Sequence, residues 1–156
     1  MSEFLKIYHP DEDMSYVLDR VVCKTVWQDK LNCLFVEIES NEEIDHIEED
    51  AIQNRFPKVI LTLEDFPIEY SSLSELNGVT LDIPESSVQK ENKDGEIEEV
   101  VYTNLCINDD DFETINNKIA FELFNGLHYL RWKGRCLDFV KETDSYLDFE
   151  FFVPIE

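Results

Sequence analysis

The chain has 156 residues and a formal net charge of −23, from 36 Asp and Glu against 13 Lys and Arg. An apolar share of 43%, with 11 Phe, 6 Tyr and 2 Trp, excludes a disordered acidic tail, because disorder requires few aromatic residues beside the charge. The longest apolar runs fall far short of the roughly 20 residues of a membrane-spanning helix, and no secretory signal is visible. We therefore expect one soluble globular domain over residues 1–156.

The negative charge is concentrated in the middle of the chain. Residues 37–117 contain twenty-three Asp and Glu but only four Lys and Arg, which leaves a net charge of −19 in about half the length. Such a domain repels polyanions and attracts cations, so its charge narrows the class of partner without defining the fold.

The first third of the chain predicts strands followed by one helix. Residues 16–28 fit a helix by apolar spacing and a strand by their β-branched residues, and we favour the strand for the second half. Residues 31–39 predict a strand that is covered on both faces. Ser40 and Glu43 form a capping box, and apolar residues at helical spacing predict an amphipathic helix over Asn41–Gln53 with an acidic outer face.

The middle of the chain predicts further strands separated by turns. A buried strand follows Pro57, and residues 71–77 predict one helical turn that Gly78 ends. Residues 78–84 then alternate between apolar and polar side chains as far as Pro84. The pair Asp94-Gly95 predicts the tip of an exposed hairpin.

The remainder predicts a meander of antiparallel strands. Apolar residues share one strand face over 97–107 and again over 146–153. The pair Asn125-Gly126 predicts a hairpin between strands 118–124 and 127–133, and Lys133-Gly134 indicates a further turn or bulge. The fold class predicted from these patterns is α+β: a single domain with an antiparallel β-rich sheet or sandwich, the acidic helix and short helical turns.

The four cysteines predict packing residues in a reducing compartment. Cys23, Cys33, Cys106 and Cys136 stand far apart, and no C-x-x-C motif occurs, although zinc and redox sites usually use close pairs. We expect buried, reduced thiols and a cytoplasmic location. An even count also permits two disulfides if the protein is exported.

Local patterns that could hold a metal ion are incomplete. Residues 90–101 resemble an EF-hand loop in their middle positions, but Lys90 and Val101 occupy the places of the principal calcium ligands. Asp109 to Glu113 could coordinate a cation or could cap a short helical turn, and we favour the cap. His46, Glu49 and Asp50 share one predicted helix face without a second His or Cys nearby. We predict no metal and no cofactor.

One segment departs from the acidic pattern. Arg131, Lys133 and Arg135 would share a strand face beside Trp132, as on a surface that stacks bases and binds phosphates. At −23 the long-range field opposes a polyanion. We therefore expect these cations to meet carboxylates of this protein or of a partner's acidic rim, and Trp132 to pack in the core. We predict that neither nucleic acid nor a membrane is a partner.

The favoured function is non-catalytic binding of a basic protein. An acidic domain of this size without a catalytic motif suits an immunity or inhibitor-type protein that neutralises a basic partner, for example a toxin such as a nuclease, by occluding its site. The partner-binding carboxylates would lie on the predicted helix and at the following strand end: Glu42, Glu43, Asp45, Glu49, Asp50, Asp109, Asp110, Asp111 and Glu113.

Two alternatives remain open. An enzyme or a small-ligand binder could assemble a site from carboxylates at strand ends, such as Asp110 and Glu113, with different roles for each acid. No nucleophile motif, zinc motif or glycine-rich phosphate loop supports an enzyme, so no catalytic residue is predicted. A scaffold or interaction module in which charge only maintains solubility is the third possibility. The oligomeric state does not follow from the sequence.

Overall fold

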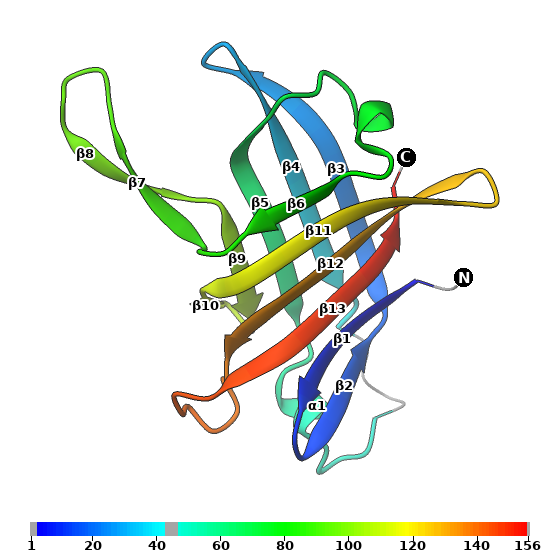
Figure 1. Cartoon of the computed structure of the whole chain (residues 1–156). Helices are drawn as coiled ribbons and strands as arrows, with labels where there is room; N and C mark the ends of the chain where they lie inside the picture. Colours follow the sequence, from blue (N-terminus) through cyan, green and yellow to red (C-terminus); the bar gives the residue numbers. More distant parts are fainter. Residues whose placement is uncertain (1–2, 43–46, 156) are drawn as a thin grey trace.

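The computed structural model describes residues 3–42 and 47–155 and consists of two antiparallel sheets packed face to face (Figure 1). The six-stranded sheet has the order β2-β1-β13-β12-β11-β6, formed by Glu12–Tyr16, Phe4–His9, Tyr146–Pro154, Leu127–Leu137, Thr114–Phe124 and Thr80–Ile83. The five-stranded sheet has the order β10-β9-β5-β4-β3, formed by Asp110–Phe112, Thr103–Ile107, Val59–Ile68, Leu31–Ser40 and Leu18–Gln28.

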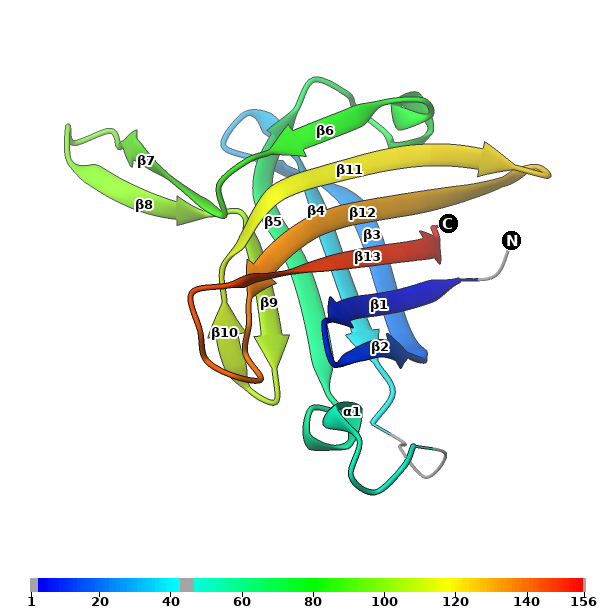
Figure 2. The same ribbon diagram turned by 60° about the horizontal axis from the view of Figure 1, so that its bottom comes forward.

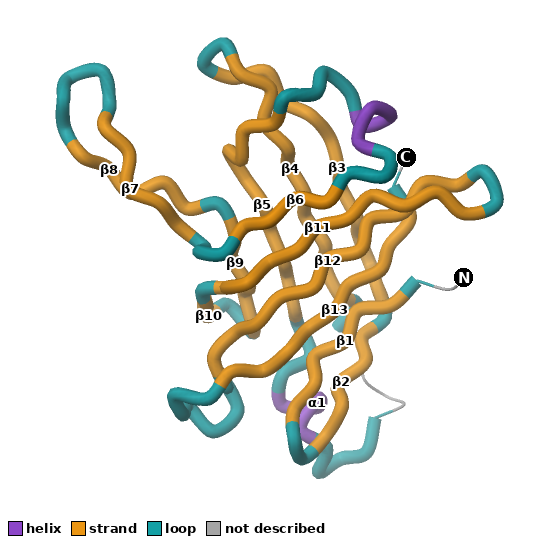
Figure 3. Tube along the Cα trace, in the orientation of Figure 1, coloured by secondary structure: helices purple, strands orange, loops and turns teal. Residues whose placement is uncertain are grey.

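Three smaller elements stand apart from these sheets. A separate hairpin of β7 (Ser87–Glu91) and β8 (Ile97–Val101) projects from the sandwich, as the tube in Figure 3 shows. The helix α1 covers Ile52–Arg55, and a 3-10 turn, η1, covers Leu73–Leu76. The 3-10 turn confirms the helical turn expected within residues 71–77, and Gly78 follows it with a φ of 81°.

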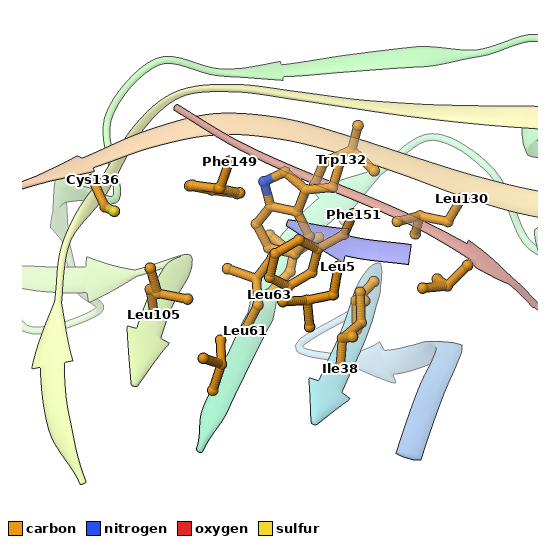
Figure 4. Packing of buried hydrophobic residues seen from close by; sticks show 14 of the residues in the cluster. Leu5, Ile38, Leu61, Leu63, Leu105, Leu130, Trp132, Cys136, Phe149 and Phe151 are labelled. Atoms are coloured by element: carbon orange, nitrogen blue, oxygen red, sulfur yellow. The ribbon is translucent and has the colours of Figure 1, made fainter. Parts of the chain in front are cut away.

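The core lies between the two sheets because apolar residues alternate along the strands. Buried and half-buried positions alternate in β9 and in the first half of β5, so every second side chain points inward. Trp132, Phe149 and Phe151 are fully or almost fully buried at the centre of the cluster, and Figure 4 shows them above Leu61 and Leu63. Burial of each large side chain contributes about 2–3 kcal/mol.

Two single-residue corners connect the sheets. The chain passes from β2 to β3 at Val17 and from β10 to β11 at Glu113, so each pair is almost one continuous strand that changes sheets. The strands of the two sheets cross in both ribbon views (Figure 2). Corners of this kind are typical of sandwiches whose sheets pack at a large angle.

Three hairpins close with two-residue turns in which both residues have positive φ. These turns are Asp29-Lys30, Asn108-Asp109 and Asn125-Gly126. Paired positive φ values define the type I′ turn, whose twist matches that of the flanking strands. The prediction for Asn125-Gly126 is therefore confirmed. The hairpin at Asp94-Gly95 is confirmed as well, but its loop is longer, and Asn92 Oδ1 accepts hydrogen bonds from the amides of Asp94 and Glu96.

The bulge expected at Lys133-Gly134 lies on the neighbouring strand instead. β12 runs without interruption, whereas β11 contains an extra residue at Asn116, which has a φ of 52°. The bulge directs the Asn117 side chain into the core, where it donates to the carbonyl oxygens of Ile83 and Thr114. Its Oδ1 accepts a hydrogen bond of 2.9 Å from Trp132 Nε1.

The predicted α+β class is wrong, because the molecule is an antiparallel β structure and the described residues of Asn41–Gln53 do not form the predicted acidic helix. Glu43 to His46 lie outside the described residues, and the described part of the range contains only the start of α1. Ser40 does not cap a helix: its hydroxyl accepts a bond from the Val59 amide and donates to the Pro57 carbonyl, which ties β4 to β5.

The true helix starts later because a carboxylate from another strand caps it. Both oxygens of Glu12, on β2, accept hydrogen bonds from the amides of Ile52 and Gln53, at 3.0 and 2.9 Å. The Gln53 amide group then bonds to both backbone groups of Ser15. These long-range contacts place one short helical turn against the edge of β2.

Along the strands, one local prediction is confirmed and two are corrected. Residues 16–28 are strand throughout, apart from the corner at Val17, which confirms the strand favoured for their second half. The single strand expected over 97–107 divides at Tyr102 into β8 and β9, which belong to different sheets. The helical turn expected after Asp109 is the hairpin of β9 and β10.

Candidate acidic cleft

An acidic cleft lies between the projecting hairpin and the β9–β10 end of the five-stranded sheet. Its volume is about 420 Å³. Four carboxylates line it: Glu64 of β5, Glu99 of β8, Asp111 of β10 and Glu113 at the corner between the sheets. No Lys or Arg occurs among the described residues that line it.

The hairpin that forms one wall is held at its base by backbone hydrogen bonds. The amides of Tyr102 and Thr103 both donate to the Ser86 carbonyl, at 2.7 and 3.2 Å, and the Glu64 amide donates to the Tyr102 carbonyl. The Tyr102 ring is buried and packs edge-on against Phe66 at 5.2 Å. This anchor directs β8 away from the sheet and leaves space between Glu99 and β9.

The carboxylate of Asp111 is fixed on the sheet side of the cleft. Asp111 Oδ1 accepts a hydrogen bond of 2.8 Å from Asn104 Nδ2 on the adjacent strand β9. The apolar part of the lining includes Val101, which is 49% exposed, and the half-buried ring of Phe112. The cleft thus combines acceptor oxygens with an apolar wall, which suits a long cationic side chain with an aliphatic stem.

Two smaller clefts lie near the hairpin; the first shares a lining residue with the main cleft, and the second is lined by the opposite face of β8. Their volumes are about 210 and 260 Å³. Glu64 lines both the main cleft and the first of these, while Gln28, Cys33 and Asp65 line both of the smaller ones. Here cations are present, because Lys24 and Lys90 contribute to the lining. The purely acidic character is confined to the main cleft.

The structure brings together only some of the carboxylates predicted to bind a partner. Asp111 and Glu113 line the main cleft, whereas Asp109 and Asp110 are exposed at the tip of the β9–β10 hairpin. Glu49 and Asp50 are exposed in the turn before α1. Glu42 pairs with Lys58, and Glu43 and Asp45 lie outside the described residues.

Lys58 joins the two predicted groups at one end of the molecule. Its Nζ lies 2.9 Å from Glu39 Oε1 and 3.0 Å from Glu42 Oε1, and the hydrogen bonds to Glu39 and then Glu42 raise the pKa of this lysine. Its backbone amide donates to Asn108 Oδ1, in the turn next to Asp109. The acidic segment after β4 and the β9–β10 tip are therefore neighbours, and Glu42 is already partnered.

Sequence reasoning missed Glu64 and Glu99. Both were visible only as charged residues of strand-like segments, and their separation in the chain gives no sign that they share a cleft. The signal that could have found them is the division of residues 97–107 at Tyr102, where β8 leaves the sheet that contains β5 and β9. In the part of the chain that the structure describes, no group of three or more His, Cys, Asp or Glu is placed to hold a metal ion.

The basic stripe on β12 pairs with carboxylates of the same sheet, as expected. Arg131 contacts Glu122 at 2.9 Å and Glu150 at 2.6 Å, and Arg135 contacts Asp148 at 3.1 Å. Lys133 lies 3.8 Å from Glu150. Trp132, which lies between these cations in sequence, points the other way and is fully buried. The outer face of the six-stranded sheet is thus close to electrically balanced.

The cysteines occur as free thiols in separate places. Cys33 and Cys136 are buried, and Cys23 and Cys106 are half-buried. Desolvation raises the pKa of Cys23 and of Cys136 to about 12. None of the described helices is long and apolar enough to cross a membrane.

Fold and cleft together define an antiparallel β-sandwich that carries an acidic cleft beside a projecting hairpin. No family model, no curated protein and no solved structure matches the chain.

Proposed function

We propose that this protein is a non-catalytic binding protein of the immunity or inhibitor type, which neutralises a basic partner by occluding its site. The observation that carries the proposal is the main cleft: four carboxylates, from three strands and the corner after β10, line it, with no cation among its described lining residues. A basic toxin, for example a nuclease, is the kind of partner that such a surface fits.

The electrostatics favour this partner over a long distance and at contact. A net charge of −23 steers a cationic protein toward the surface and speeds association about 10- to 1000-fold at low salt. At contact, an Arg or Lys side chain that enters the cleft gains charge-assisted hydrogen bonds while its stem packs against Val101 and Phe112. A nuclease must display cations in its substrate groove, and carboxylates can substitute there for phosphates.

The test begins with the capture of partners on the immobilised protein, followed by kinetics with the purified partner. We expect a basic protein whose association rate falls by about ten-fold or more as NaCl rises from about 50 to 500 mM. An acidic partner, or an association rate that does not change with salt, would reject the proposal.

Charge-matched variants separate the cleft from the net charge. The cleft variant is Glu64→Gln, Glu99→Gln, Asp111→Asn and Glu113→Gln. The control is Asp13→Asn, Asp19→Asn, Glu142→Gln and Asp144→Asn, at exposed carboxylates that do not line the cleft. Both lose four charges, so both should associate more slowly. Only the cleft variant should dissociate faster, with Kd raised about 100-fold. Equal effects of the two variants would place the interface elsewhere.

A small cationic ligand is the second candidate, favoured by the concave shape of the cleft and by the four carboxylates that line it. Calorimetric titration with spermidine and with arginine tests it. Binding that is tighter than about 100 μM, and that the cleft variant abolishes, would support a ligand-binding site or an enzyme over an inhibitor.

A further inference from the structure

The edge strand β3 is long, has one free side and differs in charge from the other edge strands. It runs for 11 residues, Leu18–Gln28, and pairs with β4 on one side only, with no described strand along its other side. The other edge strands of the two large sheets, β2, β6 and β10, have 5, 4 and 3 residues. A long free edge presents a row of unpaired backbone donors and acceptors that another strand can complete.

Charge also distinguishes this edge. β3 contains Arg20 and Lys24 against Asp19, a net charge of +1 in a chain of −23. By contrast, β2 and β10 each carry two carboxylates and no cation, and β6 carries one carboxylate. A second copy of this chain is therefore repelled at every other edge of the two large sheets and least repelled at β3.

We infer that β3 is a homodimer interface, at which two copies of the chain pair edge to edge and antiparallel about a two-fold axis. Side chains directly opposite each other in such a pair must lie on the same face of the sheet. A β-bulge lies between Leu18 and Arg20, so only residues 20–28 alternate regularly between the two faces of the sheet. A register centred on Cys23 pairs residues 20–26 of the two copies.

The charges of β3 suit this register and exclude its neighbours. With the centre at Cys23, Arg20 faces Val26 of the second copy and Lys24 faces its Val22, so no like charges oppose each other. A shift of the centre to Val22 places Arg20 against Lys24, and a shift to Lys24 places the two copies of Lys24 together. Like charges directly opposite each other destabilise a strand pair. The two cations therefore disfavour both neighbouring registers.

This dimer and the proposed recognition of a basic partner respond to salt with opposite signs. Two copies of the chain, each with a net charge of −23, repel each other at long range. Salt screens this repulsion, because the Debye length is about 10 Å at 0.1 M and about 3 Å at 1 M. Dimerisation should therefore strengthen as NaCl rises, whereas binding of a basic partner should weaken. β3 also lies at the opposite edge of its sheet from β10, which borders the acidic cleft. Either proposal can fail without the other.

The test is sedimentation of the whole chain at protein concentrations from about 10 μM to 1 mM, in 0.1 and 1 M NaCl. We expect a monomer–dimer equilibrium whose dissociation constant falls about ten-fold at the higher salt. Three variants test the register: Val22→Lys, Val22→Lys with Lys24→Glu, and the control Leu123→Lys. The control adds the same charge at a residue that is 48% exposed near the tip of the β11–β12 hairpin.

Each variant has a distinct expected result. Val22→Lys places a lysine opposite Lys24 of the second copy, and this contact occurs twice per dimer. The dissociation constant should therefore rise about ten-fold or more. Addition of Lys24→Glu converts both contacts into opposite-charge pairs and should restore dimerisation, while Leu123→Lys should leave it unchanged. Circular dichroism of each variant verifies the fold.

Several results would overturn the inference. These are a monomer at every concentration and salt, a Val22→Lys variant that dimerises as well as the wild type, or no rescue by Lys24→Glu. Hydrogen exchange supplies a further check: if β3 amides become protected only when a captured partner is added, the edge binds a strand of that partner and the homodimer is wrong.

Discussion

Replacement of Gly134 by alanine should destabilise the fold more than its single methyl group suggests. Gly134 is buried in β12 and has an ordinary strand φ, so the cost comes entirely from lack of space. A Cβ at this position would lie 2.6 Å from Phe149 Cζ and 2.7 Å from Asn117 Oδ1. Both neighbours are nearly fully buried, at 2% and 1% exposure, and the Asn117 side chain is held by three hydrogen bonds.

The expected cost has two parts. Overpacking against the Phe149 ring costs about 1–3 kcal/mol. Displacement of Asn117 Oδ1 weakens its 2.9 Å bond from Trp132 Nε1, and a buried donor left without a partner costs about 1–3 kcal/mol more. Together we expect a loss of about 3 kcal/mol in the free energy of unfolding, a large part of the total for a domain of this size.

Urea unfolding followed by circular dichroism measures this loss, with Gly126→Ala as the control. Gly126 has a φ of 79°, and no atom lies within 4 Å of the place that a Cβ would take, so alanine there costs only backbone strain of about 1–2 kcal/mol. Adding Phe149→Leu to Gly134→Ala should make the double variant more stable than the sum of the single losses. A Gly134→Ala variant that is as stable as Gly126→Ala would refute the steric argument.

Two further predictions concern buried polar groups and thiols. Asp138 Oδ1 accepts hydrogen bonds from the Val140 and Lys141 amides, and Oδ2 lies 3.1 Å from Nε2 of the buried His9, whose Nδ1 accepts the Asp11 amide. Since His9 Nε2 then carries the proton, Asp138→Asn should place the new amide group against His9 Nε2–H, two donors facing each other. Urea unfolding should show a loss of about 1–3 kcal/mol in the free energy of unfolding. A loss below about 0.5 kcal/mol would argue against this tautomer. The buried thiols should lower stability at alkaline pH. The pKa of Cys23 and of Cys136 is about 12 in the folded chain and 9.0 in the unfolded chain, so the unfolded chain loses these protons first as the pH rises. These two thiols should therefore not affect stability below about pH 8, and together they should lower the free energy of unfolding by about 3 kcal/mol between about pH 8 and 10. Urea unfolding of the wild type and of the variant Cys23→Ala, Cys136→Ala measures this loss. An equal fall in stability with pH in that variant would contradict the assignment to these cysteines.

Strands and tight turns could be predicted from the sequence because their signals are local. Alternation over 146–153 gave the inward face of β13, and Asn125-Gly126 gave a turn in which both residues take positive φ. The apolar run over 31–39 corresponds to β4. In each case the residues that carry the signal are the same residues that form the element, so no distant contact had to be known.

The helix prediction failed where a distant contact competed with a local one. The capping box at Ser40 was a valid local signal, but the Ser40 hydroxyl is used between β4 and β5, and Glu12 caps α1 instead. β1 gave no clear signal in the sequence and is set by its pairing with β13 at the other end of the chain. Contacts of this kind decide the outcome when local propensity is weak.

The cleft could be predicted only in part, for the same reason. Asp111 and Glu113 belong to a dense acidic cluster that stands out in the sequence. Glu64 and Glu99 join them only because the chain bends at Tyr102, and that bend depends on the Ser86 carbonyl, which accepts two amides. A site assembled from three strands and a corner leaves no spacing pattern along the chain.

The acidic excess is not spread evenly over the molecule, and its distribution allows two different associations. On the outer face of the six-stranded sheet, Arg131 and Arg135 are paired with carboxylates, so this face adds little to the field. The cleft contributes four carboxylates with no cation among its described lining residues, whereas β3 has a net charge of +1. A basic partner and a second copy of the chain would therefore select opposite edges of the same sheet. Because salt weakens the first contact and strengthens the second, a salt series with the purified protein and partner should resolve the two events independently.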